Sequence, residues 1–492
     1  MKILRITPTD NVAVALVGLT AGETFAVDGL KFTTLQAVEA GHKVALMPIT
    51  KGEAVIKYGS PIGLALADIA PGNTVHTHNL KTSLGGLIEY SYNPQLATLP
   101  KREPSMFQGY RRPNGKVGVR NEVWIVPVVG CVNVTATYLQ KQAETFADGV
   151  DGVYAFPHPY GCSQMSDDFE NTRKALAGLI NHPNAGAVLV LGLGCESVTI
   201  EGMKEVLGDY DPERVRFLVT QESADEYAEG VEILRELVDY AGSFRREPVP
   251  MGELIVGLVC GGSDGFSGIT ANPLVGCFTD RLIAEGGSAI LTEVPEMFGA
   301  ETVLMNRCRT SELFDDTVRL INNFKTYFMD AGQDIYENPS PGNKAGGIST
   351  LEEKSLGCIQ KGGISDVVDV LDYGEQVTHK GLNLLTGPGN DLVATSNLVI
   401  SDAQIVIFTT GRGTPFGGPV PTVKISSNTD LYERKPGWID FNSGCLLDGT
   451  SMEACTDDLY AYIRALASGE ILANNEIHNA REFTIFKTGV TL

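Results

Sequence analysis

Hydrophobic and polar positions divide the chain into two patterns, which change near residue 109. In residues 1–85, short apolar runs such as NVAVALVGL, HKVALMPI and AVIKYG are separated by glycine-containing turns at close intervals. This pattern predicts a small, mostly β domain. Residues 86–108 carry three prolines, mixed charge and no periodicity, which predicts a linker.

From Gly109 onward, apolar runs alternate with amphipathic segments, which predicts buried parallel strands with helices on both faces of each sheet. We expect two α/β units with largely parallel, Rossmann-like sheets, at 109–247 and 248–492, with the boundary at RREPVP. The predicted fold class is therefore multidomain α/β with a small, mostly β N-terminal domain. The expected strands are 123–129, 187–193, 216–220, 254–259, 288–292 and 404–409, and the expected helices are 134–147, 168–181, 223–241 and 312–330.

Composition limits the function classes. Of 492 residues, 43% are hydrophobic and 20% charged, so the chain can bury several cores and is not disordered. A net charge of −22 disfavours nucleic acid and anionic membranes as partners. We find no signal peptide, and no apolar stretch approaches the roughly 20 residues of a membrane span. Nine cysteines without a CxxC pair are typical of reduced thiols in a cytoplasmic enzyme.

The residues that follow each predicted strand are the first site candidates, because ligands bind beyond the carboxyl ends of strands in open α/β sheets. Three of these strands end in glycine and cysteine, in VPVVGCVN, LGLGCES and GLVCGGSDGFSG, and another cysteine lies in HPYGCSQ. Cysteine is also a small hydrophobe, so a core role is the alternative. The candidates at these positions are Cys131, Asn133, Cys162, Cys195, Glu196, Cys260, Ser263, Asp264 and Asn272.

Further loops supply backbone donors, carboxylates and cations. Segment 260–273 offers N–H groups to an anion, with a tight structural turn as the alternative. Glu293 and Glu296 could bind a metal or move protons, or could form an ordinary charge cluster at a helix N-terminus. The glycine-rich loops 337–358 and 408–424 carry cations that could anchor a carboxylate or could be surface residues. These cations are Lys344, Lys354, Arg412 and Lys424.

His76 and His78 form a His-x-His pair near the end of the β domain. Alternate residues of a strand point to the same side, so both imidazoles could reach one metal ion. A pair on an exposed strand face without a metal is the alternative. If both bind metal, the small domain must fold over the strand ends of an α/β domain, in its own or a neighbouring subunit.

These segments, taken in order, resemble the altronate/galactarate dehydratase family of sugar-acid dehydratases. The resemblance covers essentially the whole chain. It is carried by VIKYGSPIGLALADIAPGNTVHTHN, RRPNGKVGVRNEVWIVPVVGCVN, HPYGCSQ, HPNAGAVLVLGLGCE, CGGSDGFSGITANP, LTEVPEMFGAE, ENPSPGNKAGGISTLEEKSLGC and FTTGRGTPFGGPVPTVK. It implies that residues 1–85 form a β-clip domain. It also implies a hydro-lyase of hexuronate catabolism on the galacturonate branch, converting D-altronate to 2-keto-3-deoxy-D-gluconate, with galactarate as the alternative substrate.

The resemblance implies a divalent metal, Fe²⁺ with Mn²⁺ as a possible substitute, and no iron–sulfur cluster. A chelated metal can hold the enediolate that forms when a base removes the C2 proton. The expected metal ligands are His76, His78, Glu196 and Cys195. The expected substrate-binding residues are Asn133, Ser263, Asp264, Asn272, Arg412 and Lys424, and the expected catalytic residues are Lys344, Glu293, Glu296 and Cys162. We expect a homodimer acting on a small sugar acid; a non-catalytic sugar-acid-binding protein is the alternative from another class.

Overall fold

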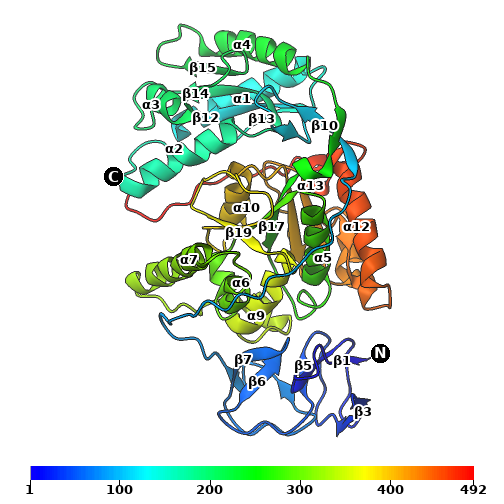
Figure 1. The fold of residues 1–492 in the computed structure, drawn as a ribbon. Coiled ribbons are helices and arrows are strands. Elements are labelled where there is room, and N and C mark those ends of the chain that lie inside the picture. The colour runs from blue at the N-terminus through cyan, green and yellow to red at the C-terminus, as the bar shows by residue number, and fades with distance from the viewer. Residues whose placement is uncertain (1, 492) are drawn as a thin grey trace.

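The structure is a computed structural model that describes residues 2–491. Three domains follow one another in space (Figure 1): the first domain, coloured blue, lies at one end, the C-terminal domain in the middle and the second domain at the other end. The C-terminal domain therefore separates the other two. No helix within 2–491 combines the length and apolar character needed to cross a membrane.

The first domain consists of three small antiparallel sheets, with no helix in residues 2–83. The strands are β1 (Ile3–Leu4), β2 (Val12–Ala15), β3 (Thr24–Val27), β4 (Leu30–Thr33), β5 (Lys43–Ala45), β6 (Ala54–Lys57), β7 (Ser60–Ala65), β8 (Thr74–Val75) and β9 (Leu80–Lys81). They pair in the orders β1-β2-β5-β8, β3-β4 and β6-β7-β9. Val55 and Ile62 continue into the core of the C-terminal domain, so the two domains are packed together. The predicted mostly β N-terminal domain is confirmed.

The second domain is a parallel sheet with the strand order β13-β12-β14-β15. Its elements are β12 (Glu122–Pro127), α1 (Asn133–Ala143), β13 (Gly152–Ala155), α2 (Ser166–Ile180), β14 (Ala185–Gly192), α3 (Ile200–Leu207), β15 (Val215–Val219) and α4 (Glu226–Ala241). Helices α1 and α4 cover one face and α2 and α3 the other. Every residue of β14 is buried, as expected when both faces of a parallel sheet are covered.

The C-terminal domain has a seven-stranded, all-parallel sheet in the order β19-β20-β18-β17-β21-β22-β23. Its strands are β17 (Ile255–Cys260), β18 (Ser288–Leu291), β19 (Val367–Leu371), β20 (Leu382–Leu385), β21 (Ile405–Thr410), β22 (Thr422–Ser426) and β23 (Phe441–Asn442). Its helices are α5 (Ala271–Ala284), α6 (Glu301–Met305), α7 (Ser311–Asp330), α8 (Pro341–Ala345), α9 (Leu351–Cys358), α10 (Asp391–Ile400), α11 (Thr429–Arg434), α12 (Met452–Ala467) and α13 (Asn474–Ile477). The predicted parallel α/β architecture is confirmed in both units.

Two connecting segments join the domains. A small antiparallel sheet of β10 (Met106–Arg111), β11 (Val117–Gly118) and β16 (Glu247–Pro250) lies where the chain enters and leaves the second domain. Before it, residues 82–105 form no helix or strand and cross the C-terminal domain. The end of the chain returns to the second domain, where Phe483 and Ile485 enter a core shared by the two α/β domains.

Candidate active site

A buried cluster of two thiols and two carboxyl groups lies at the carboxyl ends of β17 and β18. Cys260 ends β17, Glu293 and Glu296 follow β18, and Cys358 ends α9. The Sγ of Cys260 lies 3.1 Å from Glu296 Oε2 and 3.4 Å from Cys358 Sγ. Cys358 Sγ lies 3.2 Å from the same Glu296 oxygen. All four side chains are buried, so the cluster is shielded from bulk water.

Two buried lysines offset the negative charge of this cluster. Lys354 donates to Glu296 Oε1 at 2.6 Å and to Asn338 Oδ1 at 3.1 Å, and Lys361 Nζ lies 3.5 Å from Glu293 Oε2. Burial alone would raise the pKa of Glu296, but the two lysines lower it to about 2. Burial would lower the pKa of Lys354, but the nearby acids, Glu296 first, raise it above its usual value. The Glu296–Lys354 pair therefore stays ionised in the interior.

Glu293 differs from Glu296 because part of its carboxyl group has no partner. Its Oε2 accepts the Cys260 N–H at 3.0 Å, whereas Oε1 is buried without a hydrogen-bond partner in 2–491. Burial, followed by Cys260 and Glu296, raises the pKa of Glu293 well above its usual value. Its backbone φ of 66° lies in the left-handed region, which non-glycine residues rarely occupy. Strain of this kind is concentrated at functional sites.

Asp391, the first residue of α10, adds a third carboxyl group at this edge of the sheet. A Cβ on Gly261 would lie 2.3 Å from Asp391 Oδ2, so a larger residue after Cys260 would displace the Asp391 carboxylate. Burial, followed by the Glu296 charge, raises the pKa of Asp391 to about 6. Asp391 is only partly buried, in contrast to Glu293.

The first domain covers this region through a second buried ion cluster. Glu353, next to Lys354 on α9, accepts from Lys43 and Lys57, each at 2.8 Å. Burial would raise the pKa of Glu353, but the two lysines lower it to about 2. Lys43 also donates to Gly347 O at 2.8 Å. The first domain is therefore held over the strand ends of the C-terminal domain by charges removed from water.

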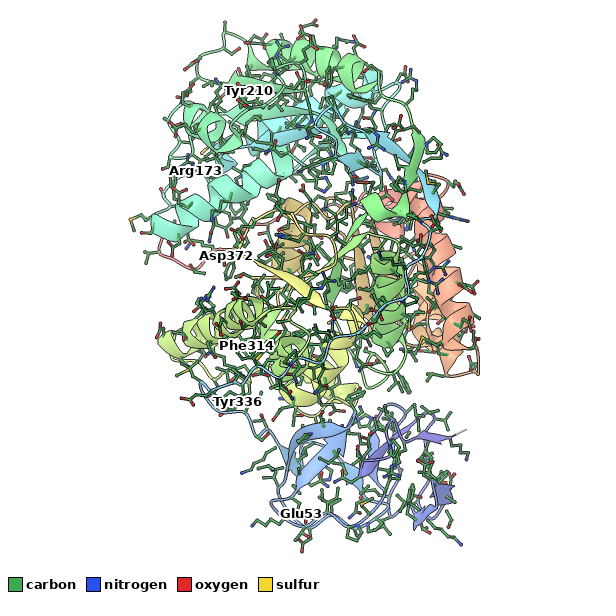
Figure 2. All side chains as sticks on the ribbon, viewed as in Figure 1. Glu53, Arg173, Tyr210, Phe314, Tyr336 and Asp372 are labelled. Carbon is green, nitrogen blue, oxygen red and sulfur yellow. The ribbon has the colours of Figure 1, made fainter. Side chains whose placement is uncertain are left out.

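Glycines in the 260–273 loop allow the first domain to approach closely. A Cβ on Gly265 would lie 2.0 Å from Gly41 O, and one on Gly268 would lie 2.2 Å from Tyr58 Oη. Figure 2 shows Tyr336 at the border of the C-terminal domain that faces the first domain, with Glu53 on the far side of the first domain. A narrow cavity at this junction is lined by Lys57, Tyr58, Ser263, Asp264, Asn272, Glu353, Lys354 and Cys358, among others.

Several predicted site residues lie in or beside the cluster. They are Glu293, Glu296, Ser263, Asp264 and Asn272. Ser263 Oγ is buried without a partner in 2–491. Asn272 accepts a hydrogen bond from the Thr409 hydroxyl of β21 at 2.7 Å and donates one to Gly357 O of α9 at 3.0 Å. It therefore holds the cavity wall in place. Asp264 accepts from the Ser267 and Ser427 hydroxyls, so it fixes the loop conformation.

The structure does not bring the four predicted metal ligands together. Cys195 and Glu196 lie between β14 and α3 in the second domain, whereas His76 and His78 belong to the first domain at the other end of the molecule (Figure 1). Glu196 accepts the backbone N–H groups of its own loop, at 3.2 Å from Leu193 and 2.6 Å from Gly194. Within one chain these four side chains therefore do not meet, and a site shared between subunits stays a prediction. Asn133 and Cys162, predicted for substrate binding and catalysis, also lie in the second domain.

The strand placement of the His-x-His pair is also wrong. Residues 76–79 form a turn after β8, so the two imidazoles do not alternate along a strand. His76 Nδ1 lies 2.8 Å from Ser349 Oγ, and His78 is exposed. The expected folding of the small domain over the strand ends is nevertheless present, but it depends on Lys43 and Lys57.

The remaining predicted cations lie around the cluster without joining it. Lys424 is buried in β22 and donates to the carbonyls of Thr414 and Phe416, and burial lowers its pKa to about 8. Arg412 is exposed and Lys344 half-buried, and neither side chain makes a hydrogen bond or ion pair in residues 2–491. Lys424 therefore braces a loop, while Arg412 and Lys344 are free to meet a ligand.

Sequence comparisons identify the family. Models of the "Altronate/galactarate dehydratase SAF domain", the "D-galactarate dehydratase/Altronate hydrolase, second domain" and the "D-galactarate/Altronate dehydratase, C-terminal" domain match residues 1–83, 109–242 and 251–491. The chain is 53% identical to altronate dehydratase of Escherichia coli (strain K12) and 52% identical to that of Bacillus subtilis (strain 168), over 100% of both chains in each case. The chain belongs to the altronate/galactarate dehydratase family. Galactarate dehydratase (L-threo-forming) of Escherichia coli (strain K12) is 32% identical, over 95% of this chain and 93% of that protein.

Family membership confirms the resemblance seen in the sequence and makes this chain a sugar-acid dehydratase, a hydro-lyase. Three residues of the dehydratase cluster were not predicted from the sequence. Cys358, Lys361 and Asp391 reach it only through tertiary folding, although Asp391 follows β20 closely and β20 was not among the expected strands. Cys260 and Lys354 were named as candidates from the sequence, but neither was assigned to metal binding, substrate binding or catalysis.

The donor set of this dehydratase cluster fits a divalent metal. One atom each from Cys260, Glu296 and Cys358 lies within 4.8 Å of the others. Two thiols and a carboxylate suit Fe²⁺ or Zn²⁺, whereas Mn²⁺ prefers oxygen ligands. Glu293 Oε1, which has no hydrogen-bond partner among residues 2–491, is a further oxygen available to a metal, a proton or a substrate.

Proposed function

We propose that this enzyme dehydrates D-altronate to 2-keto-3-deoxy-D-gluconate and water. The observation that carries this proposal is full-length identity of 53% and 52% to two altronate dehydratases, against 32% to a galactarate dehydratase. The buried acid–lysine cluster supports it, because dehydration of a sugar acid needs groups that hold an anion and move two protons. The reaction belongs to galacturonate degradation.

Cys260, Glu296 and Cys358 are the proposed ligands of an Fe²⁺ ion. Such an ion supplies a Lewis acid that lowers the cost of the negative charge that builds up when the C2 proton leaves. Lys354 holds Glu296 in position through its 2.6 Å hydrogen bond, and Asn338 orients Lys354 in turn. Partners of this kind fix the orientation of ligands and tune their basicity.

Glu293 and Asp391 are the proposed proton-transfer residues. One carboxylate takes the C2 proton; the other carboxyl group protonates the C3 hydroxyl, which leaves as water. The resulting C2–C3 enol then tautomerises to the 2-ketone. Glu293 is suited to proton transfer because its Oε1 has no hydrogen-bond partner in the described part of the chain. Asp391 is suited because it is the less buried of the two. Arg412 and Lys344 lie on neighbouring loops, and their side chains are unpaired within residues 2–491. They are the proposed contacts of the substrate's polar groups.

Anaerobic turnover tests the proposal. Chelated enzyme is refilled with Fe²⁺, Zn²⁺ or Mn²⁺ and given D-altronate, galactarate or D-mannonate, with 2-keto-3-deoxy acid as the readout. We expect Fe²⁺-dependent product from altronate. Product from galactarate alone would contradict the proposal that altronate is the substrate. Equal activity without metal would contradict the proposed metal requirement. A cytoplasmic location and a homodimer remain predictions.

A further inference from the structure

Three of the nine cysteines are exposed, and all three lie at one edge of the second domain. They are Cys131, Cys162 and Cys195, whereas the other six are buried or half-buried. Cysteine is among the most buried residue types, so three exposed thiols in one place are unusual. They follow β12, β13 and β14, which are neighbours in the parallel sheet, and therefore lie beyond the carboxyl ends of adjacent strands.

Backbone contacts tie the three cysteine loops into one surface. The N–H of Gly130, next to Cys131, donates to Tyr160 O at 2.9 Å, and the N–H of Val198 donates to Gly161 O at 3.0 Å. Gly161 adopts a φ of 99°, and a Cβ there would lie 2.0 Å from Val128 O. Only glycine therefore allows the Cys162 loop to lie against the Cys131 loop.

The surroundings of these thiols favour negative charge. Each loop leads into a helix of at least eight residues, α1, α2 or α3, whose N-terminal end carries a partial positive charge. Gln221 Nε2 also donates a hydrogen bond to Cys195 Sγ at 3.5 Å. N–H donors to sulfur are among the groups that stabilise thiolate-ligated clusters.

We propose that Cys131, Cys162 and Cys195 bind an iron–sulfur cluster at this edge of the second domain. Soft thiolates select iron–sulfur clusters or soft single ions. A single ion requires its ligand atoms close together. In residues 2–491, only the Cys260–Glu296–Cys358 group brings three such atoms within 4.8 Å of one another, so the three exposed thiols are not all within that distance. The Glu196 carboxylate accepts hydrogen bonds from its own loop, so the candidate ligand atoms at this edge are the three sulfurs.

This proposal reverses an expectation from the sequence, which indicated no cluster. The cysteines are far apart along the chain, and the sheet alone makes their loops neighbours. The proposed cluster is also independent of the Fe²⁺ site, since the two lie in different domains. Acid-labile sulfide reports on the cluster alone, so the two proposals can fail separately.

The test is chemical reconstitution of the full chain with Fe²⁺ and sulfide under anaerobic conditions. Iron and acid-labile sulfide are then measured per chain, with EPR of the dithionite-reduced protein. We expect wild type to hold labile sulfide, and Cys131→Ser, Cys162→Ser and Cys195→Ser each to lose it. Cys277→Ser, at a half-buried position on α5, is the matched control and should keep it.

Cys358→Ser distinguishes the two proposals, because it should lose Fe²⁺-dependent activity and keep labile sulfide. Circular dichroism and the urea midpoint check that the serine variants remain folded. Wild type without labile sulfide after reconstitution would overturn the proposal, as would full sulfide content in all three serine variants. Iron bound through these thiols without sulfide would also overturn it, in favour of a single-ion site.

Discussion

The two α/β domains use the same edge of a parallel sheet in opposite ways. At the carboxyl edge of the C-terminal sheet, thiols, carboxylates and lysines are buried beneath the first domain. At the corresponding edge of the second sheet, Cys131, Cys162 and Cys195 are exposed. The fold fixes the position of a site at this edge, since strand ends and helix N-termini meet there. Whether another domain covers the edge decides which side chains are buried there.

The difference shows how charge is balanced in each place. Inside the covered cluster, Lys354 and Lys361 face Glu296 and Glu293, because an unpaired charge is expensive in a low dielectric. At the open edge no paired lysine is required, since the three thiols are exposed to solvent. Removing one member of a pair should therefore be costly at the covered edge and tolerated at the open one.

The largest expected effect comes from Glu296→Gln. The change deletes the carboxylate between two thiols and leaves Lys354 without its ion-pair partner, so we expect loss of bound Fe²⁺ and of turnover. Glu301→Gln is the matched control, because Glu301 also forms a buried ion pair, with Lys325 at 2.8 Å, outside the cluster. Both variants should lose stability of similar size, about 3–5 kcal/mol, in urea unfolding. Equal iron content in the two variants would place the metal elsewhere.

Glu293→Gln and Asp391→Asn should lower kcat by about 10²–10⁴-fold, the usual contribution of general acid–base catalysis. The roles separate by isotope exchange. The variant that lacks the base no longer exchanges the substrate's C2 hydrogen with D₂O, whereas the variant that lacks the acid still exchanges it without forming product. Asp402→Asn, a buried carboxylate paired with Lys116 at 2.8 Å, is the control. Normal kcat in either cluster variant would remove that residue from the mechanism.

Sequence reasoning found the architecture and half of the cluster, for different physical reasons. The strands of 187–193 or 254–259 are continuous apolar runs, so local pattern was sufficient, and all six expected strands appear with ends within two residues. Short strands such as β13 and β20 carry too little pattern to be recognised. Glu293 and Glu296 were found because they follow an identified strand. Cys358 and Lys361 were not, because only the docking of α9 and of the 3₁₀ turn that follows it places them there.

Glu353→Gln should loosen the cover over the C-terminal edge. The change leaves Lys43 and Lys57 buried without a carboxylate, and we expect a loss of about 3–5 kcal/mol and faster protease cleavage in residues 82–105. Glu23→Gln is the control, because its pair with Lys2 is exposed to solvent and should contribute little to stability. Because a narrow cavity has to open before a sugar acid can enter, KM should change more than kcat. Unchanged proteolysis would mean that other contacts hold the cover.

Mild acid should weaken the second domain through His182, whereas the Glu353 ion cluster should withstand it. Burial lowers the pKa of His182 to about 3, from an ordinary value near 6.5, whereas the lysines hold the pKa of Glu353 near 2. Below pH 6.5 the unfolded chain binds a proton at His182, whereas the folded chain does not. The free energy of unfolding therefore decreases as the pH is lowered, by about 2 kcal/mol at pH 5. The Glu353 contribution persists above the ordinary carboxyl pKa and is lost only as the pH falls from there toward 2.

The measurement is urea unfolding at pH 8 and pH 5 with a probe for each domain, because His182 lies where the second domain meets the C-terminal domain. Its Nε2 lies 3.1 Å from Ala403 O, and its ring stacks on Trp124. His182→Gln should lower stability at pH 8 but flatten the difference between the two pH values. His78→Gln, at an exposed position, should retain the wild-type difference. If His182→Gln kept the full acid loss, other groups would make the second domain the acid-sensitive one.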